Sequence, residues 1–144
     1  KIEALNEKKA KIDAEITESI MIEDEKKADE LFHLFSSLGI TVSLDDFGSG
    51  YSSLGYLSKY SFNKIKIDKL LIDRVAQGNI SGLNVVNAAI NMGKAVGLKT
   101  IAEGVESQEQ LDILIEMGCD QVQGYYLGRP VPADVFEEQY LKKS

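Results

Sequence analysis

Residues 98–118 read LKTIAEGVESQEQLDILIEMG, and this stretch carries the signals of one strand–helix unit. Leu98–Ala102 is short and contains Thr and Ile, which predicts a strand. Ser107–Met117 predicts a helix, because Ser107 and Gln110 form a capping-box pattern at its start and a glycine follows its end. A strand followed closely by a helix is the repeating unit of parallel βα folds.

The same alternation extends in both directions from this unit. About five strands are predicted, and eight are needed to close a barrel of about 250 residues. The chain is therefore either a small open doubly wound sheet or part of a barrel. Further strands are predicted at Ile12–Thr17, Ile40–Leu44, Asn63–Ile67 and Asp120–Gln123, and further helices at Ile22–Leu38, at Ile80–Val96 and from Pro132.

Composition limits the classes of function. The 144 residues support one domain. Sixteen basic against 23 acidic residues give a net charge of −7, which argues against binding long nucleic acid. One cysteine and one histidine exclude a disulfide framework and zinc sites built from several such ligands. No apolar run is long enough to span a membrane, so we expect a cytoplasmic protein, or the cytoplasmic part of a membrane-anchored one.

Polar side chains fall at the carboxyl ends of the predicted strands. Because these ends meet at one rim of a parallel sheet, residues far apart in sequence converge there. Several carboxylates remain ionised together only around a cation, and an all-oxygen set favours Mg²⁺ or Mn²⁺ over zinc. Two such ions about 4 Å apart can activate water and hold a phosphodiester. The residues are Glu15, Asp45, Asp46, Lys66, Asp68, Glu103, Glu106 and Gln123.

Lys66 allows two interpretations. In KIKI, alternation places Lys64 and Lys66 on one face and the isoleucines on the other. A lysine facing a barrel interior needs carboxylates or phosphate around it, whereas lysines of an edge strand lie in water. The loop at 45–57, DDFGSGYSSLGYL, is equally ambiguous: its glycines and serines could bind phosphate or form a plain turn.

Five motifs resemble the EAL-domain family, phosphodiesterases that open the bacterial second messenger cyclic di-GMP. They occur in the family's order and cover nearly everything from Ile12 onward. The resemblance implies an α/β fold, a partial TIM-type (β/α)₈ barrel containing about the last five strands and their helices, so that residues 1–144 are the C-terminal part of one EAL domain. The motifs are AEITES (14–19), LDDFGSGYSSL (44–54), KIKIDKLLI (64–72), TIAEGVES (100–107) and QVQGYYLGRP (121–130).

The resemblance also implies a reaction, the hydrolysis of cyclic di-GMP to linear pGpG with Mg²⁺ or Mn²⁺, two ions in the complete domain. Glu15 resembles a metal ligand, and Asp45 and Asp46 resemble the carboxylate pair that shares the metals. Glu103 resembles the glutamate assigned as general base or as a ligand of the second metal. Lys66 resembles the lysine that positions the attacking water or the phosphate.

Four further residues have implied supporting roles. Gln123 and Asp68 resemble residues that position the substrate and the water. Glu18 and Glu106 resemble the glutamates that anchor the DDFG loop.

Two metal ligands of the family have no counterpart. The family's Glu-Ala-Leu lies several βα units before the motif that contains Glu15, whereas Glu3-Ala4-Leu5 lies only 12 residues before it. We interpret Glu3 as a coincidence, because so short a segment cannot contain the missing strands. The metal-binding asparagine is also absent. The chain alone is therefore expected to be inactive, and the alternative function is a module that binds cyclic di-GMP without cutting it.

Partners follow from the same reasoning. An open half barrel should expose apolar strand faces and an unpaired edge, so the chain should need the rest of its parent or a second copy, with a homodimer or an exchange of elements as one route. In the parent, a sensor or a GGDEF-type domain is expected upstream. The expected ligand is cyclic di-GMP.

Overall fold

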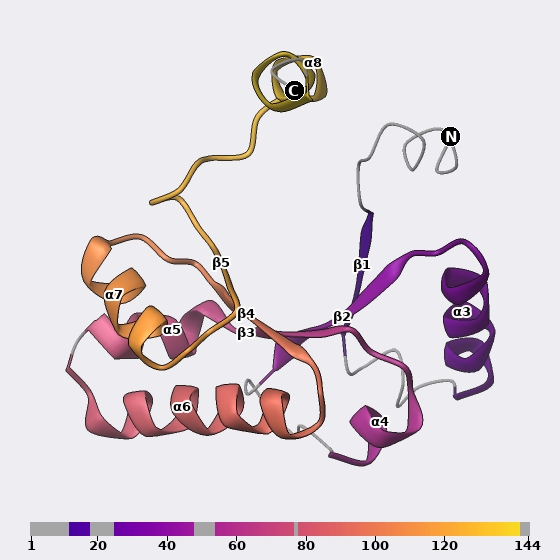
Figure 1. Ribbon diagram of the computed structural model, residues 1–144, viewed down its shortest axis with the longest axis horizontal. Coiled ribbons are helices and arrows are strands. Elements are labelled where there is room, and N and C mark those ends of the chain that lie inside the picture. Colours follow the sequence, from indigo (N-terminus) through magenta and orange to yellow (C-terminus); the bar gives the residue numbers. More distant parts are fainter. Residues whose placement is uncertain (1–11, 18–24, 48–53, 77, 142–144) are drawn as a thin grey trace.

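A computed structural model describes residues 12–17, 25–47, 54–76 and 78–141 (Figure 1). Its centre is a sheet in which five strands lie side by side in chain order and every neighbouring pair is parallel. The predicted strands are therefore all present, with ends shifted by up to three residues. They are β1 (Asp13–Thr17), β2 (Thr41–Phe47), β3 (Lys64–Ile67), β4 (Lys99–Glu103) and β5 (Gln121–Gln123).

Helices follow the strands as the βα pattern predicts. The helix that begins after Ser107 has the predicted cap: the Ser107 side chain accepts a hydrogen bond from Gln110 N, and the Gln110 side chain accepts one from Ser107 N. Two short helices, α4 and α5, were not predicted. The helices are α3 (Glu25–Ser37), α4 (Leu54–Lys59), α5 (Lys69–Ala76), α6 (Ile80–Ala95), α7 (Gln108–Glu116), α8 (Ala133–Phe136) and the π-helical turn η1 (Glu137–Leu141).

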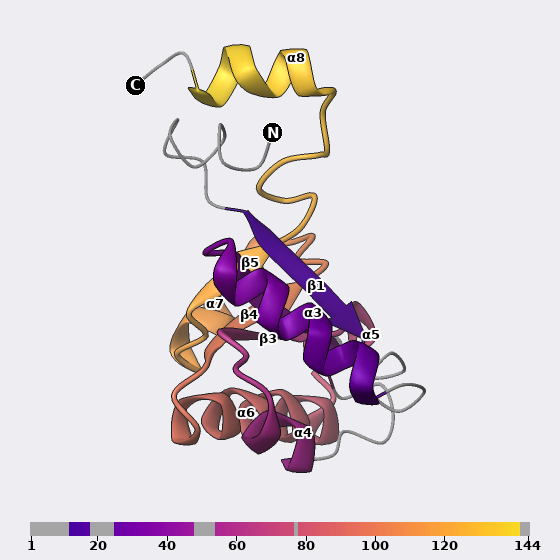
Figure 2. The same ribbon diagram turned by 90° about the vertical axis from the view of Figure 1, so that its right-hand side faces the viewer.

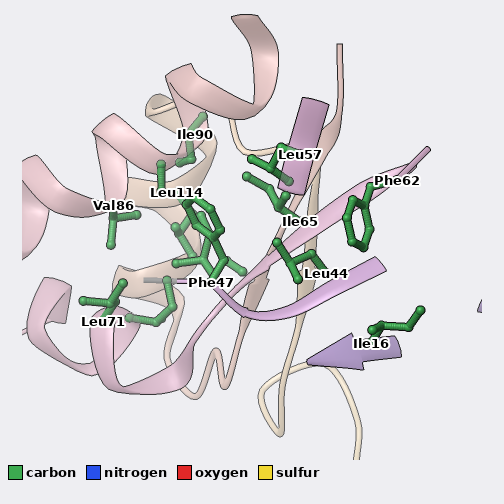
Figure 3. Close-up of a cluster of buried hydrophobic side chains, with 14 of the residues drawn as sticks. Ile16, Leu44, Phe47, Leu57, Phe62, Ile65, Leu71, Val86, Ile90 and Leu114 are labelled. Carbon is green, nitrogen blue, oxygen red and sulfur yellow. The ribbon is translucent and has the colours of Figure 1, made fainter. Parts of the chain in front are cut away.

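One face of the sheet forms the hydrophobic core. Alternate strand residues such as Leu44 and Ile65 point toward the helices and are almost fully buried (Figure 3). Val86 and Ile90 of α6 and Leu114 of α7 pack in the same cluster. This burial is the main favourable contribution to the stability of the sheet and its helices.

The opposite face of the sheet is polar, which corrects the expectation of exposed apolar strand faces. By strand alternation and register it carries Asp13, Glu15, Thr41, Ser43, Asp45, Lys64, Lys66, Lys99, Glu103, Gln121 and Gln123, with Ile101 as its apolar member. The large hydrophobic side chains that are exposed in the described ranges lie on helices, at Val96 directly after α6, and in the segment after β5. The apolar argument for a second copy therefore fails, while the edges formed by β1 and β5 remain.

The chain leaves the sheet after β5. In both views α8 lies apart from the sheet and from helices α3 to α7 (Figures 1 and 2). Pro132 is the N-cap of α8, immediately before its first turn, in agreement with the predicted start. None of the helices in the described ranges is long and apolar enough to cross a membrane.

Candidate active site

Lys66 lies at the centre of the polar residues. Its Nζ is 2.5 Å from Glu15 Oε1, 2.5 Å from Glu103 Oε1 and 3.5 Å from Asp45 Oδ1. These three carboxylates come from β1, β4 and β2, at or near the carboxyl ends of the strands. The predicted convergence at one rim is therefore present.

The environment of Lys66 decides between its two interpretations. β3 is the middle strand of the five, and Lys66 is only 3 % exposed. Burial by itself would lower the pKa of this lysine, but hydrogen bonds with Glu103 and Glu15 and the charge of Asp45 raise it above its ordinary value. Lys66 therefore carries a fixed positive charge, and the edge-strand interpretation is wrong.

A bulge brings two consecutive aspartates to this rim. The register between β2 and β3 shifts between Leu44 and Phe47, and Asp46 between them has a φ of 58°. A bulge re-aims side chains at the end of a strand, and Asp tolerates this left-handed backbone better than most residues. Desolvation of the Asp46 carboxyl and the charges of Asp45 and Asp68 raise the pKa of Asp46.

The other predicted residues lie around this centre. Asp68 is the N-cap of α5, since its Oδ1 accepts a hydrogen bond from Leu70 N at 2.5 Å. Gln123 ends β5 and, with Glu103 and Glu106, lines a cavity of about 270 Å³. Glu106 Oε1 lies 3.0 Å from Lys69 Nζ, and residues 48–53 of the loop that Glu106 is predicted to anchor lie outside the described residues. Glu18 lies outside the described residues.

The carboxylates at this rim are of the ligand type that a hard divalent cation prefers. Asp45 Oδ1 is buried and accepts no hydrogen bond from the described residues, and its charged neighbour is the Lys66 ammonium at 3.5 Å. In the same ranges, no three acidic, histidine or cysteine side chains lie close enough together to hold one ion. The Lys66 ammonium lies between Glu15 and Glu103, so an ion bound here must share the rim with that charge.

The comparison with protein families decides the assignment. A sequence model described as EAL domain matches residues 2–130. The chain belongs to the EAL family. Two relatives are the Pseudomonas aeruginosa bifunctional diguanylate cyclase/cyclic di-GMP phosphodiesterase MucR, 38 % identical over 120 residues, and the Escherichia coli cyclic di-GMP phosphodiesterase PdeR, 37 % identical over 146 residues. The match covers 83 % of this chain and 17 % of MucR, and 99 % of this chain and 22 % of PdeR.

Solved EAL structures share the fold. The phosphodiesterase of MucR in complex with c-di-GMP has a TM-score of 0.79 and 35 % identity, over 92 % of this chain and 55 % of that one. The Klebsiella pneumoniae BlrP1 manganese/cy-diGMP complex has a TM-score of 0.75 and 26 % identity, over 90 % of this chain and 33 % of that one. The five parallel strands and their helices thus match EAL barrels over part of their length, as the partial-barrel interpretation predicts.

One contact at the site was missed by sequence reasoning. Lys69 at the start of α5 binds Asp73 and Glu106, and its side chain lies against Gly104, next to Glu103. The i,i+4 spacing of Lys69 and Asp73 was a visible signal. The contact with Gly104 joins residues 35 positions apart, so nothing local in the sequence predicts it.

Proposed function

We propose that the protein containing this chain hydrolyses one phosphodiester bond of cyclic di-GMP to give pGpG, with Mg²⁺ or Mn²⁺ as cofactor. The observation that carries the proposal is the convergence of Glu15, Asp45 and Glu103 on Lys66 at the carboxyl end of a parallel sheet. The choice of substrate is supported by two relatives, the cyclic di-GMP phosphodiesterase PdeR and the MucR phosphodiesterase in complex with c-di-GMP.

The residues divide into three roles in this proposal. Glu15, Asp45 and Asp46 hold the metal, because their oxygens are the hard ligands that Mg²⁺ and Mn²⁺ prefer. Such ions, when bound, stabilise negative charge on a phosphate and lower the pKa of water. Glu103 accepts the proton of the attacking water, and the Lys66 ammonium neutralises charge that develops on the phosphate oxygens.

Gln123 and Asp68 are assigned to orienting the water and the phosphate. Gln123 ends β5 beside the cavity that Glu103 lines, which is within the region that a substrate at this rim would occupy. Asp68 combines this role with capping α5. Glu18 and Glu106 are assigned to anchoring the DDFG loop.

A second candidate is a module that binds cyclic di-GMP without cutting it. Two observations favour it. The family's metal-binding Glu and Asn have no assigned counterpart in this chain, and in the described ranges Lys66 neutralises carboxylates that a metal would otherwise need. A rim in which the Lys66 ammonium already lies between Glu15 and Glu103 can lack the ions that activate water.

The test is an assay of the complete parent protein with cyclic di-GMP and either Mg²⁺ or Mn²⁺. Metal-dependent pGpG formation is expected, and Asp45→Asn should lower kcat by on the order of 100-fold or more, because it weakens a metal ligand. Asp112→Asn on the exposed side of α7 is the matched control and should keep the parent's rate.

Calorimetry without metal separates the two candidates. Absence of pGpG in the parent with both metals would sink the phosphodiesterase, and tight binding in that same protein would establish the binding module. Absence of binding as well would remove both. Residues 1–144 alone are proposed to be inactive, and metal-dependent turnover by this chain would overturn that part.

A further inference from the structure

Lys69 lies directly on the backbone that carries Glu103. Gly104, the next residue, has a φ of +69° and no side chain, and a Cβ placed on it would be 2.4 Å from Lys69 Cγ and 2.6 Å from Cδ. The methylene stem of Lys69 therefore occupies the space over Gly104. Only glycine fits there, because it adopts a positive φ without strain and has no Cβ to collide with the stem of Lys69.

The far end of Lys69 is also held. Its Nζ is 2.9 Å from Asp73 Oδ1 on α5 and 3.0 Å from Glu106 Oε1 on the segment after β4. Hydrogen bonds with Asp73 and Glu106 raise the pKa of Lys69 above its ordinary value, so the side chain remains charged. The stem is thus stretched across Gly104 between a backbone attachment on α5 and two carboxylates.

The other side of the same segment is fixed by β5. Val105 N donates to Gln123 O at 3.0 Å, and Tyr126 N donates to Val105 O at 3.0 Å. A Cβ on Gly124 would be 2.1 Å from Val105 O, so these two backbones touch. Residues 103–106 therefore lie between Lys69 on one side and the end of β5 on the other.

We infer that Lys69 is a positioning residue, which fixes Glu103 by packing its stem on Gly104, and that the ion pairs serve to hold the stem in place. This inference rests on the proposed function, since Glu103 is a catalytic residue only there. Exposed ion pairs by themselves contribute little to the free energy of folding. The contact with Gly104 is specific, and a catalytic group needs to be held within about 0.5 Å of its productive position.

Hydrogen exchange on the 144-residue chain tests the contact without reference to catalysis. Lys69→Ala should speed exchange at the amides of Val105 and Tyr126 on the order of ten-fold, because it removes one wall of the segment. Lys94→Ala is the matched control: Lys94 likewise lies over a left-handed glycine, Gly118, but at the opposite end of the sheet. Unchanged exchange in Lys69→Ala would overturn the inference.

Turnover of the complete parent protein tests the consequence. Lys69→Ala should lower kcat on the order of ten-fold, and more than it raises KM, because the proton acceptor Glu103 is then held less firmly. Lys69→Met keeps the stem without the charge and should recover most of the loss, whereas Gly104→Ala should reproduce it from the other side of the contact.

The outcomes separate this inference from the proposed function. If the unmodified parent forms no pGpG, the proposed function fails, and the exchange measurement still decides whether Lys69 fixes the segment. If the parent is active and the Lys69→Ala variant has the same kcat as the parent, the positioning role is wrong. If Lys69→Met is as impaired as Lys69→Ala, the charge and not the stem carries the effect, which also overturns the inference.

Discussion

Replacing Lys66 by methionine removes the ammonium group that lies among three carboxylates. The side chain of Lys66 is 4 % exposed, while Asp45 and Glu103 are each 21 % exposed and Glu15 is 49 % exposed. Methionine keeps most of the stem, so packing is nearly preserved and the change is mainly one of charge. The variant is expected to fold with a lower free energy of unfolding at pH 7.

The magnitude follows from the burial of each partner. A charged hydrogen bond contributes about 1.5–3 kcal/mol, and Lys66 makes two close ones, with Glu15 and Glu103. Glu15 regains water when the lysine is lost, so most of the cost comes from Glu103 and from repulsion of its neighbour Asp45. Removing the lysine also removes the free-energy cost of keeping its charge buried, which offsets part of this loss. The net loss should be about 2–3 kcal/mol.

Urea unfolding of the 144-residue chain, followed by circular dichroism at low salt, measures this loss. Lys64→Met on the same face, with Asp13 as its partner, is the control and should cost about 1 kcal/mol or less. Equal losses in the two variants would refute the reasoning.

Three smaller predictions concern the scaffold. Gly93→Ala places a Cβ 2.7 Å from Thr100 Cγ2, so overpacking should outweigh the better helix propensity of alanine. The free energy of unfolding, measured in a urea titration, should fall by about 1–3 kcal/mol, and a stabilised variant would contradict the contact. Asp120 Oδ2 accepts hydrogen bonds from Thr100 N at 2.9 Å and Thr100 Oγ1 at 3.0 Å, which lower the pKa of Asp120 below its ordinary value of 3.8. The stabilisation by these hydrogen bonds is therefore complete above about pH 4 and is lost as the pH falls through the lowered pKa. Asp120→Ala should lower the free energy of unfolding by about 1 kcal/mol at pH 7 and by less at pH 2, as measured by unfolding at both values. Asp68→Ala removes the acceptor for Leu70 N and should cost about 1 kcal/mol by loss of the helix cap, seen as a lower Tm; an unchanged Tm would show that the cap contributes nothing.

Local pattern predicted much of the architecture. Alternation in KIKI assigned Ile65 and Ile67 to one face and Lys66 to the other, and burial agrees for the isoleucines. The capping box at Ser107 predicted where α7 begins. These succeed because period-two alternation and helix caps depend on residues a few positions apart.

Short helices and contacts between distant elements were not predicted in this way. α5 has eight residues, and its start depends on Asp68, which the sequence analysis assigned to the substrate. The polarity of the open sheet face was also missed, because it appears only when alternation is followed across all five strands together. That polarity removes the apolar reason for expecting a second copy.

Sequence alone was enough to predict the order of the strands and of the longer helices and the acidic residues that meet at one rim, because these follow from local spacing and from the shared direction of parallel strands, and its motifs indicated the family. The tertiary structure alone decided that β3 lies in the middle of the sheet, that Lys66 is buried among Glu15, Asp45 and Glu103, and that Lys69 packs on Gly104. The free energy of a buried charge depends on which side chains surround it, and those neighbours come from strands that only pairing brings together.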